Sequence, residues 1–128
     1  MIQSPPRPLI LLVDDNEANL ELLQAYLEEV RGTIMTARDG LEALRCLEAH
    51  KPDLILLDVM MPRMSGYQLC KRLKSDAATR GIPIVMVTAL TEVSDQERAE
   101  EVGADDFISK PITKPDLLAR IARYLPKG

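Results

Sequence analysis

The sequence predicts an α/β fold in which a parallel five-stranded sheet lies between two layers of helices. Short aliphatic runs alternate along the chain with segments whose leucines recur at helical spacing. The runs Leu9–Val13, Leu54–Leu57 and residues 82–87 contain no charge, which is typical of strands buried on both faces of a parallel sheet. The intervening loops are short, so each parallel return needs a crossover helix.

The composition indicates one ordinary globular domain of 128 residues, of which 46% are hydrophobic and 28% charged. The net charge of -4 and the scattered Lys and Arg residues argue against direct nucleic-acid binding. We find no apolar run of membrane-spanning length and no signal-peptide core. Cys46 and Cys70 lack CxxC spacing and a neighbouring His, which favours reduced thiols in a cytoplasmic protein.

The first third of the chain predicts a lead-in, two strands and a helix. Residues 1–8 hold three prolines without periodicity and predict a disordered lead-in. Leu9–Val13 predicts a buried strand that ends in the acids Asp14 and Asp15. Asn16 or Asp15 can cap the next helix, which is expected to continue to Gly32. The shorter and more polar run Thr33–Ala37 predicts an edge strand.

Two more helices flank the strand Leu54–Leu57. Asp39 and Gly40 open the first of them. The strand ends at Asp58, and Ser65 and Gln68 then have the spacing of a capping box.

The last third predicts two strands and two helices. Residues 82–87 form an apolar strand that finishes at Thr88. Ser94 and Glu97 predict a capping box for a helix over residues 94–102, which has little apolar surface to hold it. Residues 107–108 predict a short strand that ends at Lys110, and Thr113 caps the terminal helix.

The polarity of the strands predicts their order. The first, third and fourth are the most apolar and should be central, while the second and fifth should form the edges. This distribution is compatible with the flavodoxin-like, doubly wound order 2-1-3-4-5. Its switch point lies between strands one and three, where open α/β sheets bind ligands.

Five polar residues follow the ends of four strands and should therefore converge. They are Asp14, Asp15, Asp58, Thr88 and Lys110. Three converged carboxylates repel one another unless a cation neutralises them, and oxygen ligands without His or Cys select Mg²⁺ or Ca²⁺. Lys110 and Thr88 could hold a phosphoryl group, which leaves Asp58 as the best-placed nucleophile.

These residues, together with Met61-Pro62, Gly66, Ala89 and Pro111, resemble the receiver domain of two-component response regulators over residues 9–125. The segment is most similar to receivers of diguanylate cyclase regulators or hybrid histidine kinases. The resemblance implies a regulatory domain that catalyses only its own phosphorylation and dephosphorylation, and we expect no output domain after Leu125.

The resemblance also implies roles for individual residues. Asp58 would accept a phosphoryl group from a phosphohistidine of a histidine kinase or phosphotransfer protein. Asp15, Asp58 and the backbone carbonyl of Met60 would bind Mg²⁺, with Asp14 acting mainly through water. The remaining expected roles are phosphoryl binding by Thr88 and Lys110, a switch made by Thr88 and Phe107, and homodimer formation on phosphorylation.

Two other function classes fit less well. A phosphatase of the haloacid-dehalogenase type needs a second acid two residues after its nucleophile, and Met60 occupies that position. A flavodoxin needs a phosphate loop rich in Ser, Thr and Gly after the first strand, whereas this loop begins with Asp14 and Asp15.

The lifetime of a phosphoryl group on Asp58 should depend on two apolar neighbours. Met60 and Leu90 lie two residues after Asp58 and Thr88. Neither side chain can orient or deprotonate a hydrolytic water. The sequence therefore predicts slow self-dephosphorylation.

Overall fold

The computed structural model of the chain describes residues 7–89 and 92–125. Most of the predicted lead-in, residues 1–6, and the predicted site neighbour Leu90 lie outside the described residues. Pro8 is described, and its carbonyl accepts a hydrogen bond from the Thr33 N–H at 2.8 Å. No helix in the described part of the chain is long and apolar enough to cross a membrane.

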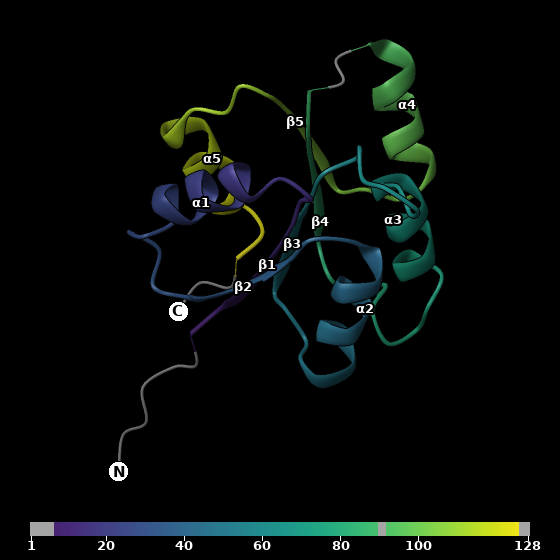
Figure 1. The fold of residues 1–128 in the computed structure, drawn as a ribbon, viewed down its shortest axis with the longest axis horizontal. Coiled ribbons are helices and arrows are strands. Elements are labelled where there is room, and N and C mark those ends of the chain that lie inside the picture. The colour runs from purple at the N-terminus through teal and green to yellow at the C-terminus, as the bar shows by residue number, and fades with distance from the viewer. Residues whose placement is uncertain (1–6, 90–91, 126–128) are drawn as a thin grey trace.

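Five parallel strands form one sheet in the order β2-β1-β3-β4-β5 (Figure 1). The predicted fold class, strand order and choice of edge strands are therefore confirmed. The strands are β1 (Leu9–Val13), β2 (Thr33–Ala37), β3 (Leu54–Leu57), β4 (Ile84–Thr88) and β5 (Asp106–Ser109).

The alternation of side chains along the strands builds a core on each face of the sheet. On one face, Ile10 and Leu12 of β1 pack with α1 and α5. On the other, Leu11 and Val13 pack with the helices that cover that face, α2, α3 and α4. Figure 1 shows the same division, with α1 and α5 on one side and α2, α3 and α4 on the other. The buried strands are apolar throughout because both of their faces are covered.

Each helix begins where the local sequence offers a cap, and the predicted cap is the observed one with one exception. The side chains of Asn16, Asp39, Ser65 and Thr113 accept from backbone N–H groups of the first turn. The Ser65 and Gln68 capping box is confirmed. The helices are α1 (Glu17–Tyr26), α2 (Gly40–Ala49), α3 (Gly66–Lys74), α4 (Val93–Glu101) and α5 (Lys114–Ile121).

The exception is α4, where the predicted capping box of Ser94 and Glu97 is wrong. The helix starts at Val93, and the Asp95 carboxylate accepts from the Glu92 N–H at 3.1 Å. Ser94 lies inside the first turn, so its hydroxyl is not the cap. Gly103 follows the helix with a φ of 91°, a conformation that favours glycine.

Helix α1 is shorter than its leucine pattern predicts, because the chain must turn early to enter the sheet. It ends at Tyr26, and the Val30 N–H donates to the Leu27 carbonyl in the turn that follows. A Cβ on Gly32 would lie 2.8 Å from the Pro8 carbonyl oxygen. This close approach lets Thr33 pair beside Leu9.

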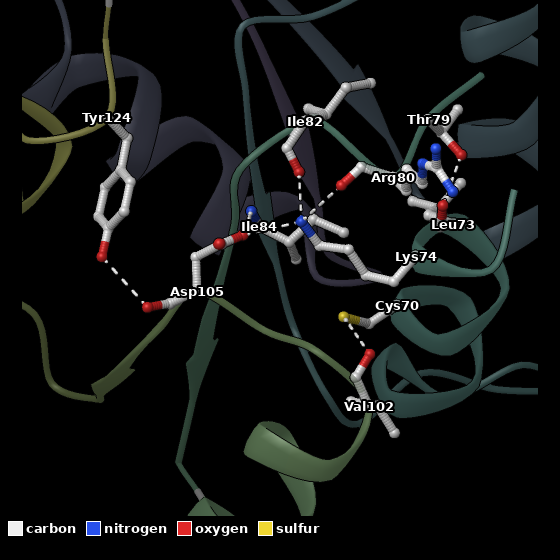
Figure 2. A network of polar contacts seen from close by, with 10 residues as sticks. All are labelled: Cys70, Leu73, Lys74, Thr79, Arg80, Ile82, Ile84, Val102, Asp105 and Tyr124. Atoms are coloured by element: carbon white, nitrogen blue, oxygen red, sulfur yellow. Dashed lines mark hydrogen bonds and ion pairs between the residues drawn. The ribbon is translucent and has the colours of Figure 1, made fainter. Parts of the chain in front are cut away.

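Strand β4 begins at Ile84, two residues later than predicted, because Lys74 binds the preceding loop. Its ammonium donates to the carbonyls of Ile82 at 2.8 Å and Arg80 at 3.2 Å, and pairs with Asp105 at 2.9 Å (Figure 2). The same Asp105 carboxylate accepts from the Ile84 N–H at 2.8 Å. One half-buried lysine therefore joins the end of α3 to the starts of β4 and β5.

We predict that Lys74→Met destabilises the fold by about 2–3 kcal/mol, because it leaves a carboxylate and two carbonyls without their cation. Urea unfolding followed by circular dichroism measures the change. Lys71→Met, at an exposed position on the same helix, is the matched control. Equal effects of the two substitutions would contradict the structural role of Lys74.

Candidate functional site

The carboxyl ends of four strands bring the predicted polar residues together. Asp14 and Asp58 directly follow β1 and β3, which pair in parallel with Val13 opposite Leu57. Thr88 is the last residue of β4, and Lys110 directly follows β5. The Lys110 N–H donates to the Thr88 carbonyl at 2.8 Å, so the ends of these two strands are joined.

Three carboxylates form the acidic part of the site. Asp14, Asp15 and Asp58 each offer an oxygen, and these oxygens all lie within 4.8 Å of one another. Asp14 and Asp58 are buried, whereas Asp15 is exposed. The Asn16 N–H donates to an Asp14 oxygen at 2.9 Å, which fixes that carboxylate at the start of α1.

Lys110 lies between the two buried acids. Its Nζ is 3.2 Å from Oδ2 of Asp14 and 3.7 Å from Oδ1 of Asp58. Burial is the main cause that raises the pKa of Asp58 to about 6, and the charge of Asp14 raises it further. Lys110 and the backbone N–H groups of Val59 and Met60 oppose this rise. Asp58 is thus an acid whose negative charge is poorly compensated by the protein alone.

The donor set fits a hard divalent cation. Three carboxylates converge, no His or Cys accompanies them in the cluster, and one buried member has a raised pKa. A cation beside these oxygens would relieve the repulsion and favour the charged form of Asp58. Oxygen ligation of this kind matches Mg²⁺ and Ca²⁺ better than a transition metal.

Glycine at position 66 allows α3 to start against the loop that follows Asp58. The Gly66 N–H donates to the Val59 carbonyl at 2.8 Å. A Cβ at this position would collide with the Asp58 carbonyl and would lie 2.8 Å from the Val59 Cα. The start of α3 is therefore held directly against the backbone that carries Asp58.

The remaining predicted site residues lie around this centre in different environments. Thr88 is 1% exposed and Met60 is 63% exposed. Phe107 is half-buried and lines a groove of about 270 Å³ between α4 and β5, outside the acidic cluster. The sequence reasoning assigned no role to Tyr67, which is buried directly after Gly66 and contacts α4. In the sequence, the signal for this contact is a large aromatic side chain directly after Gly66.

Comparisons with known proteins agree with this geometry. Residues 10–122 match the family model of the response regulator receiver domain. The response regulator PleD of Caulobacter vibrioides is 48% identical over 112 residues, which cover 88% of this chain but 25% of PleD. The chain thus spans about a quarter of that relative.

Two further proteins match along most of their own length. The polar-differentiation response regulator DivK of Brucella anthropi is 40% identical over 116 residues, 91% of this chain and 94% of DivK. The receiver domain of the sensor histidine kinase PA1611 from Pseudomonas aeruginosa, solved with a magnesium ion in its active site cleft, is 29% identical with a TM-score of 0.84. That match covers 92% of this chain and 97% of the solved one. The chain therefore belongs to the receiver domain family of two-component response regulators.

Proposed function

We propose that this chain is a signalling switch that receives a phosphoryl group on Asp58 from a phosphohistidine donor. Membership of the receiver family supports phosphorylation-dependent signalling by a regulatory domain. The observation that carries the choice of residue is the position of Asp58. Its carboxylate lies at the end of a central strand, next to two other acids and 3.7 Å from the Lys110 ammonium.

The proposed transfer needs a carboxylate nucleophile and groups that hold the phosphoryl oxygens. An Asp58 oxygen attacks phosphorus, and the bond from phosphorus to the donor imidazole breaks. The electron pair of that bond stays on the imidazole nitrogen, so the products are an acyl phosphate and a free histidine. The Lys110 ammonium and the Thr88 hydroxyl bind phosphoryl oxygens and stabilise their charge.

The cation proposed for this site is Mg²⁺. Asp15, Asp58 and the backbone carbonyl of Met60 would hold it, with Asp14 acting mainly through water. When bound, Mg²⁺ supplies positive charge to the phosphoryl oxygens. The clustered carboxylates support this choice, as does the magnesium ion in the related PA1611 receiver.

The proposed switch links the acceptor to the face made by α4, β5 and α5. A dianion on Asp58 draws the Thr88 hydroxyl toward it, and Phe107 turns into the space that this movement vacates. Phe107 is half-buried beside the groove, which supports the proposal that its ring has room to turn. The altered face would bind a downstream protein or a second copy of the chain.

The proposed unit is residues 9–125, acting in the cytoplasm with a histidine kinase or a histidine phosphotransfer protein as donor. The match of the family model to residues 10–122 supports this extent. The kinase and phosphotransfer partners follow from the phosphohistidine chemistry. We propose that the chain binds neither nucleic acid nor membrane directly.

We predict that acetyl phosphate with Mg²⁺ adds one acid-stable, base-labile phosphoryl group to the chain. Chelation of the metal should prevent labelling, because the acidic cluster then repels the donor. Intact-protein mass spectrometry with peptide mapping should locate the label on Asp58. Asp58→Asn should take no label, and full labelling of that variant would contradict the proposal. Lys110→Met should keep metal binding while weakening the link between labelling and shape change.

We predict that Asp58→Asn stabilises the metal-free protein above pH 6. The pKa of Asp58 is raised to about 6 in the folded state from 3.8, so folding favours the protonated form and stability falls as pH rises through this range. The gain should be about 1–3 kcal/mol at pH 7.5 and about half as large at pH 5. Chemical unfolding in EDTA at both pH values measures it.

Asp15→Asn is the control for that experiment, since it removes an exposed carboxylate from the same site. A pH-independent effect of Asp58→Asn, or a loss of stability at pH 7.5, would contradict the burial argument.

We predict that Met60→Asn shortens the lifetime of the phosphoryl group about tenfold, because an amide at this exposed position can orient water behind phosphorus. The rate is the loss of label from isolated phosphoprotein in Mg²⁺ buffer. Met60→Leu keeps an apolar side chain and should decay at the wild-type rate. A decay of Met60→Asn no faster than wild type would contradict the prediction.

A further inference from the structure

Helix α4 has little apolar contact with the rest of the molecule. All nine of its residues are described, and among them Ala99 alone is buried. A helix of this length is marginal in water without tertiary contacts. Its position must therefore be set by a small number of specific interactions.

Those interactions come from α3, near both ends of α4. The Tyr67 hydroxyl donates to the Asp95 carbonyl at 3.0 Å, and the Arg98 guanidinium carbon lies 4.8 Å from the centre of the Tyr67 ring. Tyr67 is only 5% exposed, so its hydrogen bond to Asp95 is partly shielded from water, whereas the exposed Arg98 makes its cation–π contact at the surface. After the last turn of α4, the Cys70 thiol donates to the Val102 carbonyl at 3.5 Å (Figure 2).

The opposite flank of α4 is open. The groove of about 270 Å³ beside Phe107 separates part of α4 from the start of β5. Gln96, Ala99 and Glu100 form its α4 side. Helix α4 is thus attached along α3 and has space beside β5.

Tyr67 directly follows the residue that packs against the backbone of Asp58. It follows Gly66, whose N–H binds the Val59 carbonyl and whose missing side chain leaves room for the Asp58 carbonyl. A displacement of the loop after Asp58 would therefore move the start of α3. The Tyr67 side chain would then carry this movement to the first turn of α4.

We propose that Tyr67 is a positioning residue that ties α4 to the loop carrying Asp58, so that α4 follows this loop when Asp58 is modified. The transmission step rests on the proposed function of Asp58. The tie itself is a property of the unphosphorylated fold. The Tyr67 hydroxyl is its central element, because it bonds the backbone of α4 rather than a mobile side chain.

Hydrogen exchange of the unphosphorylated chain tests the tie. Tyr67→Phe keeps the ring in the core and removes the hydroxyl, and exchange of the α4 amides should rise about fivefold, the factor expected for one ordinary hydrogen bond. Tyr124→Phe is the control, since its hydroxyl lies 3.2 Å from the Asp105 carbonyl and 3.1 Å from the Asp106 carboxylate, away from α3. Unchanged α4 exchange in Tyr67→Phe, or an equal rise in every helix, would overturn the proposal.

Exchange after labelling with acetyl phosphate and Mg²⁺ tests transmission. Labelling should alter α4 exchange in wild type and in Tyr124→Phe, and the alteration should shrink at least twofold in Tyr67→Phe although Asp58 is labelled to the same extent. An undiminished response in Tyr67→Phe would overturn transmission through this residue. If wild type takes no label, the proposed function fails, while exchange of the unphosphorylated variants still decides whether the tie exists.

Discussion

The burial of the Asp58 carboxylate is the constraint on which the rest of the site depends. Asp58 directly follows the carboxyl end of a central aliphatic strand. Asp14 adds a second buried negative charge beside it. The Lys110 ammonium partly offsets the two charges, and the pKa of Asp58 still rises to about 6. The arrangement stabilises the fold poorly but suits a site that takes up a cation, because the repulsion between the acids is relieved when positive charge arrives.

The helices differ in how firmly they are held against the sheet. Helices α1 and α5 bury leucines and isoleucine against β1, β3 and β4, and Lys114 of α5 pairs with Glu29 at 2.7 Å. Helix α4 buries one alanine and depends on Tyr67 and Cys70 of α3. Regions with few buried contacts reorganise at low free-energy cost, so α4 is suited to the displacement proposed above.

Membership of the receiver family agrees with the residues that argue against the other function classes. Met60 stands where a haloacid-dehalogenase phosphatase needs a general acid, and its side chain is 63% exposed beside the acceptor. The loop after β1 offers Asp14 and Asp15, whereas a flavin phosphate needs uncharged donors. Both features fit a regulatory domain of the receiver family.

The sequence by itself determined the five strands, which of them are central, and the convergence of Asp14, Asp58, Thr88 and Lys110 at the carboxyl ends of the strands, while the exact strand order was compatible with the pattern and was implied by the family resemblance. These features follow from local patterns, because a doubly buried strand must be apolar and parallel strands end on the same side. The caps of α1, α2, α3 and α5 were predictable for the same reason, since each lies within three residues of the N–H that it accepts from.

Only the tertiary structure decided where α1 ends, how Lys74 shortens β4, and that Tyr67 holds α4. In each case the deciding partner is remote in sequence: Pro8 packs on Gly32, Lys74 pairs with Asp105, and Tyr67 binds Asp95. Contacts of this kind leave no periodic pattern in the sequence, because each depends on the fold that the local patterns have already built.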